Sequence, residues 1–218
     1  MPLLLLLLIA LTFSTPLAST IALAEEEPLY KADFEDIEIG EVPDDFLVLE
    51  GEFAVEEEEG GNKILALPGQ PLSTFTALFG AAEIEGNAIS ARIKAEAQKR
   101  RLSSFAVGLN GVSGYRLQIN PTRRLLEFYR EETLEASAEY NWKSGDWTYL
   151  KLRVRKLEEG KWRIEGKAWK EGENEPSGWS IAFEEAEEPH TGRPSIWGIP
   201  YAEKPIWFDD ILITPSAG

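Results

Sequence analysis

The sequence predicts an all-β protein in which two antiparallel sheets pack face to face as a sandwich. Apolar and polar residues alternate in short runs along most of the chain after residue 24, as expected of strands with one buried and one exposed face. Gly, Pro and Asn separate these runs, and no convincing long helix interrupts them. Many short strands without helices are typical of a two-sheet sandwich.

The expected strands follow one another from residue 29 to residue 214. They cover residues 29–34, 46–49, 52–57, 63–67, 74–79, 88–97, 103–109, 114–120, 125–131, 147–156, 161–170, 179–184 and 205–214. No repeat, low-complexity tract or linker divides this series, so we expect residues 25–218 to form a single domain.

The first 24 residues have the pattern of a signal peptide. A leucine-rich core runs from Leu3 to Leu11, and Ala22-Leu23-Ala24 forms a small-x-small cleavage site. No Lys or Arg precedes the core, so a membrane anchor is the alternative, although the apolar stretch is shorter than the ~20 residues of a spanning helix. No second apolar segment of that length follows. We expect a secreted or periplasmic protein without a membrane span after cleavage.

The composition excludes several classes of function. The chain has no cysteine, which removes disulfides and thiol nucleophiles and fits a secreted or envelope protein of a bacterium. Its formal net charge of −16 repels nucleic acids. The only histidine, His190, lies in an expected loop, and no Gly-x-Ser-x-Gly motif or phosphate-binding loop is present.

The strands at 147–156 and 161–170 are expected to form a hairpin. Gly160 suits the left-handed position of a short loop between them. A slip of one residue would turn every side chain to the other face, so the apolar pattern defines the register. It pairs residue 157 with residue 161, Val154 with Ile164, Arg153 with Glu165 and Tyr149 with Trp169.

A second hairpin is expected around residues 120–125, with Ile119 opposite Leu126. Its register places Leu117 opposite Phe128 on the inner face. If both hairpins lie in one sheet, their outer faces form one polar surface with aromatic rings. That surface contains Arg116, Gln118, Glu127, Tyr129, Tyr149, Arg153, Glu165 and Trp169.

This combination of side chains is suited to a sugar. Flat rings stack on the apolar faces of pyranoses, while Arg and Gln side chains bond to hydroxyls. We therefore predict a glycan-binding site at Arg116, Gln118, Tyr129, Tyr149 and Trp169. The alternative is that Tyr149 and Trp169 are an ordinary cross-strand pair with a structural role.

We find no sequence evidence for catalysis. A retaining glycosidase needs two carboxyl groups about 5 to 5.5 Å apart, which positions i and i+2 of a strand can provide. The nearest outward acidic pair, Glu127 and Glu131, is too widely spaced. The acidic turn at 171–175 follows Trp169, and we expect it to be solvated, with Trp169 and Trp179 on opposite sides of one sheet. We therefore assign no catalytic residue.

Several short motifs occur in a familiar order. They are Asp33-Phe34-Glu35-Asp36 with Gly40 and Pro43, Gly114-Tyr115-Arg116-Leu117-Gln118, Gly145-Asp146-Trp147, Gly166-Lys167-Ala168-Trp169, Glu175-Pro176 with Trp179, residues 192–198, and the closing run 206–211. In this order the chain resembles the concanavalin A-like lectin/glucanase superfamily. It is particularly similar to the laminin-G-like and 3-keto-disaccharide hydrolase-like jelly rolls of secreted bacterial proteins.

The resemblance implies a jelly roll whose first and last strands lie together. Residues 34–36 would then approach residues 208–210, where related proteins often hold a structural calcium ion. We predict such a site at Glu35 and Asp209, with Asp209 on the same face as Ile211 and Ile213. The alternative is that these acids bond backbone amides at the sheet edge.

Three hypotheses for the function follow. The first is a secreted, non-catalytic, lectin-like module whose partner is a glycan or polysaccharide. The second is a glycoside hydrolase or 3-keto-disaccharide hydrolase-like enzyme on the same fold. The third is a structural or adhesion module without a small ligand, because this fold hosts all three.

Overall fold

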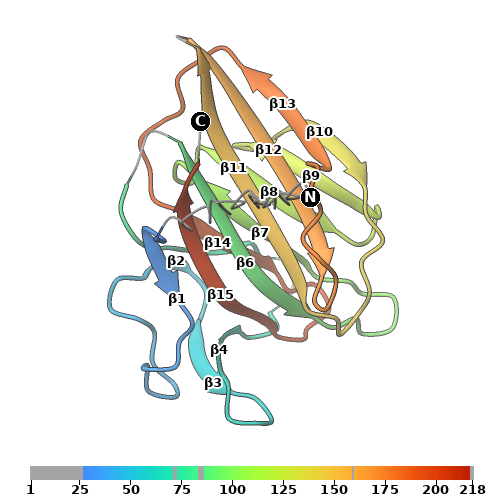
Figure 1. Cartoon of the computed structure of the whole chain (residues 1–218). Coiled ribbons are helices and arrows are strands. Elements are labelled where there is room, and N and C mark those ends of the chain that lie inside the picture. Colours follow the sequence, from blue (N-terminus) through green and yellow to red (C-terminus); the bar gives the residue numbers. More distant parts are fainter. Residues whose placement is uncertain (1–26, 71–72, 83–85, 159, 217–218) are drawn as a thin grey trace, which may run out of the picture.

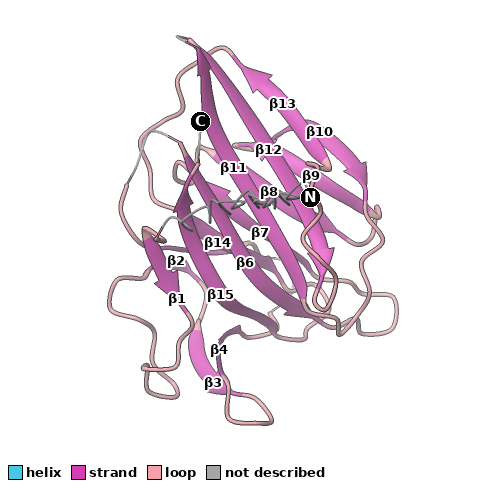
Figure 2. Cartoon of the chain, in the orientation of Figure 1, coloured by secondary structure: helices cyan, strands magenta, loops and turns pink. Residues whose placement is uncertain are grey.

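The computed structural model describes residues 27–70, 73–82, 86–158 and 160–216. The predicted signal peptide, residues 1–24, lies outside this range. The described part consists of strands and loops, as Figure 2 shows. In the ranges described, no helix is long and apolar enough to cross a membrane.

The strands form two layers, which confirms the predicted antiparallel sandwich. In Figure 1 the first layer lies in front with β11, β12, β6 and β15, and the second lies behind it with β8, β7 and β14. Sheet A has the order β13 (Ile181–Glu185), β12 (Lys161–Lys170), β11 (Thr148–Glu158), β6 (Asn87–Ala95), β15 (Ile206–Pro215), β4 (Lys63–Leu67) and β3 (Ala54–Glu57), with β1 (Tyr30–Ala32) also paired to β15. Sheet B has the order β10 (Thr133–Glu139), β9 (Leu125–Arg130), β8 (Tyr115–Asn120), β7 (Ser104–Leu109), β14 (Ser195–Ile199), β5 (Phe75–Leu78) and β2 (Leu47–Glu50).

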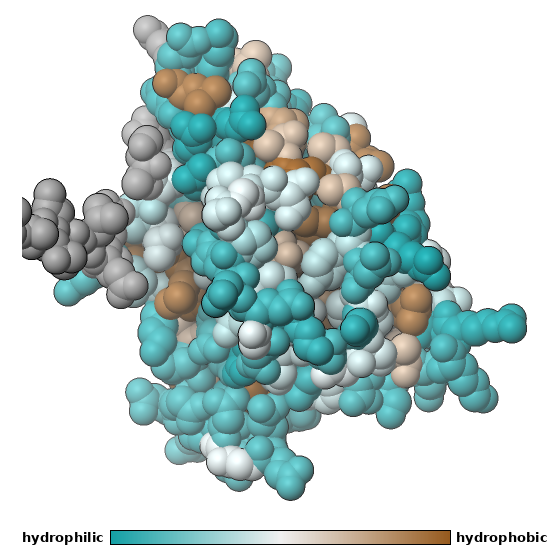
Figure 3. All heavy atoms as spheres, turned by 45° about the vertical axis from the view of Figure 1, so that its right-hand side comes forward, coloured by the Kyte–Doolittle hydropathy of each residue, from teal (hydrophilic) through white to brown (hydrophobic). Residues whose placement is uncertain are grey.

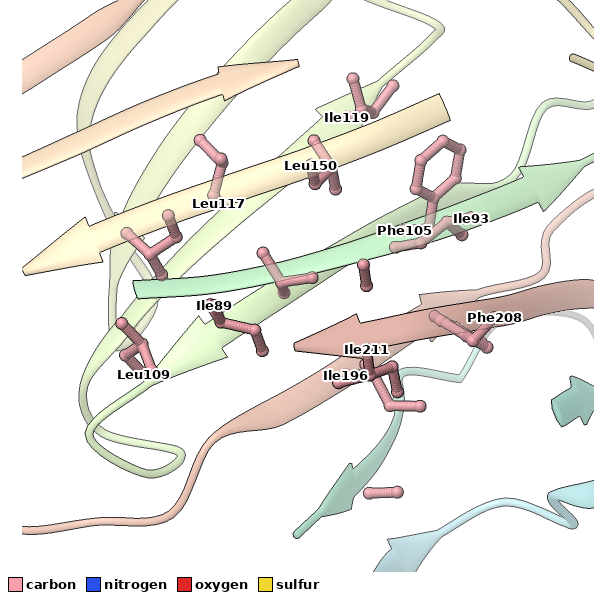
Figure 4. Close-up of a cluster of buried hydrophobic side chains, with 14 of the residues drawn as sticks. Ile89, Ile93, Phe105, Leu109, Leu117, Ile119, Leu150, Ile196, Phe208 and Ile211 are labelled. Carbon is pink, nitrogen blue, oxygen red and sulfur yellow. The ribbon is translucent and has the colours of Figure 1, made fainter. Parts of the chain in front are cut away.

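The core fills the space between the sheets. Figure 4 shows Ile93 and Leu150 of sheet A together with Phe105 and Leu117 of sheet B, and each is at most 1% exposed. Burial of one such side chain contributes about 1.5 to 3 kcal/mol. The packing is very close at Gly166, where an added Cβ would lie 2.6 Å from the Leu117 side chain. No larger residue fits there without movement of the opposite sheet.

Both predicted hairpin registers are confirmed in the strands. Ile119 pairs with Leu126, and Tyr149 pairs with Trp169. The turn of the β11–β12 hairpin differs from the prediction, because an irregularity after Lys156 makes residue 158, not residue 157, the partner of residue 161. Gly160 has a φ of 70°, as predicted.

Two strands were not predicted. The edge strand β10 has no alternation of large apolar and polar residues, so only its backbone pairing with β9 reveals it. The sequence Ser-Ile-Trp-Gly-Ile of β14 is short, does not alternate apolar and polar residues, and lies between Pro194 and Pro200. Its position between β7 and β5 makes it an interior strand of sheet B.

A β-bulge in β15 overturns the predicted orientation of Asp209. The pairing with β6 shifts between Asp209 and Leu212, and Asp210 has a φ of 48°. Phe208 and Ile211 therefore both belong to the core, while Asp209 pairs with Arg92 on the outer face. The expectation that Asp209 shares a face with Ile211 and Ile213 was wrong, because it assumed unbroken alternation. As the jelly-roll resemblance implies, β1 and β15 do pair directly.

Candidate functional site

The predicted binding residues lie on two different surfaces. Arg116, Gln118 and Tyr129 belong to the β8–β9 hairpin of sheet B, whereas Tyr149 and Trp169 belong to the β11–β12 hairpin of sheet A. The outer faces of the two sheets point away from each other, so the condition that both hairpins share one sheet is not met. We call these surfaces the sheet A face and the sheet B face.

On the sheet A face, the two predicted rings pack against each other. The Tyr149 and Trp169 rings are stacked, with centroids 5.1 Å apart and an interplanar angle of 10°. Trp169 is only 8% exposed. One face of the Trp169 ring is therefore covered by Tyr149, which limits its use for stacking on a sugar.

The charged groups of the sheet A face bond to one another. Glu165 accepts hydrogen bonds from Arg153 Nε at 2.9 Å and from Arg163 Nε at 3.1 Å, and Arg155 Nε lies 3.3 Å away. Burial alone would raise the pKa of Glu165, but the hydrogen bond and charge of Arg153, with those of its neighbours, lower it below its ordinary value. The carboxylate is thus fully engaged.

The acidic turn between the tryptophans folds back over this face. Glu175 Oε1 lies 2.9 Å from Lys151 Nζ and 2.8 Å from Lys167 Nζ, and Lys167 also donates to the carbonyl oxygen of Pro176 at 2.6 Å. The ring centroid of Trp179 is 4.7 Å from Lys167 Nζ.

Two expectations for this segment were therefore wrong. The turn is bonded to the sheet through Glu175 instead of being only solvated. Trp179 lies on the same outer side as Trp169, because Lys167, which its ring contacts, precedes Trp169 by two residues in β12. Both expectations came from local sequence patterns, which do not predict the contacts of Glu175 and Trp179 with Lys167 that form when the loop packs on the sheet.

The predicted calcium ligands have other partners. Asp209 is bound by the Arg92 guanidinium and by Asn62 Nδ2 at 3.1 Å, and it accepts from the amide of Asp210 at 2.8 Å. Glu35 accepts from the amide of Lys63 at 3.1 Å. In the part of the chain that the structure describes, no three acidic or histidine side chains group as a metal site. The positive charge of Arg92 beside Asp209 would repel a calcium ion. The calcium site therefore remains a prediction, and these contacts do not favour it.

On the sheet B face, an arginine lies between two rings. The Arg116 guanidinium carbon is 4.9 Å from the ring centroid of Tyr129 and 4.8 Å from that of Trp197. Both rings are partly exposed. Cation–π contacts of this kind stabilise an arginine whose flanks are desolvated.

Trp197, which was not among the residues of the predicted site, is positioned by two small residues. Its Nε1 donates to Ser195 Oγ at 2.8 Å. A Cβ added at Gly108 would lie 3.1 Å from the same Nε1, so the ring occupies the space above this glycine. The sequence of β14 gives no clear signal for this orientation, because the adjacent apolar residues Ile196 and Trp197 break the alternation.

Arg116 and Gln118 have unused hydrogen-bonding capacity. The Arg116 side chain is 10% exposed, its Nε is buried without a partner, and its closest carboxylate is the Glu132 side chain at 3.7 Å. Gln118 is 6% exposed, and no described residue bonds to its side-chain amide. Buried polar groups are normally satisfied, and the Nε of Arg116 is an exception. With the neighbouring Gln118 amide, which bonds to no described residue, it indicates a site for a ligand.

Glu127 holds one side of this cluster in place. It is fully buried, and its Oε2 accepts from Asn120 Nδ2 and from the Tyr129 hydroxyl, each at 3.0 Å. Its Oε1 lies 2.7 Å from Arg123 Nη1. Burial, and then the bond to Glu127, raises the pKa of Tyr129. Glu127 thus orients Tyr129 through Oε2, and its full burial and the ion pair with Arg123 separate it from a ligand on the surface.

A pocket of about 480 Å³ adjoins the cluster at the end of sheet B. Its lining includes Leu78, Asn110, Glu131, His190 and Arg193. Leu78 pairs with Ser195, which pairs with Gly108, the register partner of Arg116. Leu78, in the wall of the pocket, therefore lies in the same cross-strand row as Arg116. On the side shown in Figure 3, by comparison, the surface is mainly hydrophilic with small separate apolar areas.

Comparisons with known proteins identify the fold. No family model matches the sequence, and no curated protein matches it. Among solved structures, a carbohydrate-binding module CBM66 from Bacillus subtilis has a TM-score of 0.54 at 11% identity, over 78% of this chain and 95% of that chain. The carbohydrate recognition domain of Emp46p has a TM-score of 0.59 at 10% identity, over 89% of this chain and 100% of that one.

An enzyme shares the same architecture. A marine PL-14 alginate lyase from Aplysia kurodai has a TM-score of 0.52 at 11% identity, over 87% of this chain and 99% of that chain. The fold of this protein is thus a concanavalin A-like jelly roll, as its sequence resemblance implies. At these identities the likeness concerns the fold alone.

Proposed function

We propose that this protein binds carbohydrate on the sheet B face, with Arg116, Gln118, Tyr129 and Trp197 at the centre of the site. One observation carries the proposal. Two partly exposed rings contact the Arg116 guanidinium, which has no close carboxylate among the described residues, and the unbonded Gln118 amide lies two residues along the same strand. Sugars combine apolar C–H faces with planar arrays of hydroxyls, so rings beside polar donors complement both features.

The solved structures of the same fold support this proposal without identifying the ligand. Two of the similar proteins are described as a carbohydrate-binding module and a carbohydrate recognition domain. Because identity is near 10%, we rest the site assignment on the residues of this chain alone. Tyr149 and Trp169, on the opposite face, are not part of the proposed site.

We propose a binding function without catalysis. The acid of the cluster, Glu127, is fully buried; its Oε2 accepts hydrogen bonds from Asn120 and Tyr129, and its Oε1 forms an ion pair with Arg123. The raised pKa of Tyr129 keeps its phenol protonated near neutral pH, which removes it as a general base. We further propose that residues 1–24 are a signal peptide and that residues 25–218 act as one secreted or periplasmic domain.

A glycan array tests the binding function with two matched variants. Purified residues 25–218, Trp197→Ala and Trp169→Ala would be applied to neutral and acidic glycans. Each variant removes one tryptophan, but from opposite faces of the sandwich. We expect Trp197→Ala to lose its signals at least tenfold and Trp169→Ala to retain them when compared at equal concentrations of folded protein.

The array also separates the alternatives. Signals that disappear with Trp169→Ala and persist with Trp197→Ala would move the site to sheet A. The absence of binding to every glycan would reject the proposal and favour a structural module. Cleavage of a bound glycan, detected by mass spectrometry, would reject the non-catalytic assignment.

A further inference from the structure

Arg116 differs from the other well-buried arginines of the outer faces. Arg92, with a side chain 14% exposed, lies 2.5 Å from Glu171, and Arg153, 23% exposed, lies 2.9 Å from Glu165. Arg116 is less exposed than either, yet its closest carboxylate is 3.7 Å away. In a chain of net charge −16, a guanidinium without a close carboxylate is notable, because acidic side chains are abundant.

Among the described residues, Glu132 is the one acidic side chain paired with Arg116, and a ligand can displace it. Glu132 is 89% exposed and lies in the β9–β10 turn. An exposed ion pair of this geometry contributes little to stability. The carboxylate of a ligand can therefore displace Glu132 at a small cost in free energy. It can then form the bidentate contact that guanidinium groups favour, which is shorter than the present 3.7 Å.

We infer that the glycan bound by the sheet B face contains a uronic acid, whose carboxylate binds Arg116. This inference rests on the proposed carbohydrate-binding function and specifies its ligand. The rings of Tyr129 and Trp197 hold the guanidinium plane in a fixed orientation, which favours a planar carboxylate. Gln118 lies two residues along β8 on the same face and offers its amide to a neighbouring hydroxyl.

The net charge limits the form of this glycan. A protein of charge −16 repels a long polyanion, whereas a short oligosaccharide carries few charges. We therefore expect the site to favour short acidic oligosaccharides, or glycans in which uronic acids are separated by neutral sugars.

The test compares each acid with its own methyl ester. Titration calorimetry would use the trisaccharides of galacturonic, glucuronic and mannuronic acid, together with their fully methyl-esterified forms, which keep the shape and lose the charge. We expect at least one acid to bind at least tenfold more tightly than its ester. Arg116→Gln should abolish this preference, and Glu132→Gln should increase affinity for the acid several-fold.

Two controls separate charge at the site from charge in general. Arg163→Gln removes one positive charge from the sheet A face, where Arg153 and Arg155 still contact Glu165, so its affinity should be unchanged. Arg116→Lys keeps the positive charge but loses the bidentate geometry. We expect its affinity for the acid to lie between those of the wild-type protein and Arg116→Gln. Circular dichroism and melting curves would establish that each variant is folded.

The outcomes distinguish this inference from the function on which it rests. If only neutral glycans bind, and binding depends on Trp197, the uronic acid is excluded while carbohydrate binding stands. Equal affinity of the acids for wild-type protein and for folded Arg116→Gln would also overturn the inference. If no glycan of either kind binds, the proposed function itself fails.

Discussion

The two outer faces of the sandwich contain similar residue types but use them differently. On the sheet A face, arginines, lysines and carboxylates bond to one another, and the loop after β12 closes over them through Glu175 and Trp179. On the sheet B face, Arg116 and Gln118 lie beside two rings and keep donors that no close protein group uses.

The difference shows that residue type alone does not mark a binding site. An aromatic ring beside a cation occurs on both faces, and on sheet A it belongs to a closed set of internal contacts. What separates the faces is the presence of close carboxylates. Among the described residues, Arg92 and Arg153 on sheet A each have one within hydrogen-bond distance, whereas the nearest to Arg116 is 3.7 Å away. A ligand carboxylate therefore adds a close contact at Arg116. We therefore expect substitutions on the sheet A face to act mainly on stability and those on the sheet B face mainly on binding.

The largest expected effect on stability is at Trp169. Trp169→Ala removes a buried ring and its stacking on Tyr149, so we expect a loss of about 3 kcal/mol in the free energy of unfolding. The partly exposed Trp197 should cost about 1 to 2 kcal/mol when it is replaced by alanine. Urea unfolding curves would measure both, and the reverse order would contradict the contrast between the faces.

Glu165 should rank next. Glu165→Gln leaves Arg153, Arg155 and Arg163 without their shared carboxylate, and we expect a loss of about 2 kcal/mol. The matched control is Glu184→Gln, because Glu184 also pairs with Arg163 but is 62% exposed and should cost less than about 0.5 kcal/mol.

The Glu165 contribution should also depend on pH. Its pKa is lower in the folded protein than in the unfolded chain, so the unfolded state takes up the proton first as the pH falls. The stabilisation is therefore present above the ordinary glutamate pKa of about 4.3 and is lost below it. The stability difference between wild type and Glu165→Gln should shrink from pH 5 towards about pH 3. A difference independent of pH over that range would refute the charge-based explanation.

A smaller effect is expected where the loop meets the sheet. Glu175→Gln weakens the contacts to Lys151 and Lys167 at a site that is 42% exposed, and we expect a loss of about 0.5 to 1 kcal/mol. Limited proteolysis should cleave the loop faster in this variant. Glu173→Gln, in the same turn but without an ion pair among the described residues, should behave as wild type.

The smallest effect is expected from metal removal. Because Arg92 already neutralises Asp209, addition of a chelator should leave the melting temperature unchanged. A decrease that calcium reverses would instead support the predicted site at Glu35 and Asp209 and would require Arg92 to move.

The predictable part of the candidate site was its hairpin. Arg116, Gln118 and Tyr129 were correctly grouped, because turn chemistry and period-two alternation define the register of β8 with β9. Trp197 was missed because its strand is short and lies between prolines, and its contact with Arg116 joins residues far apart in the sequence. Tyr149 and Trp169 were correctly paired with each other, but they lie in sheet A and not in the sheet of Arg116.

The sequence by itself determined the fold class, most of the strands and both hairpin registers, because these follow from alternation and turn residues within a short stretch of chain. Only the tertiary structure decided which sheet each hairpin joins, the bulge that turns Asp209 outward, and the closure of the acidic loop over sheet A. These features depend on the packing of segments that are distant in sequence, so local patterns carry no information about them. The same packing leaves Arg116 without a close carboxylate.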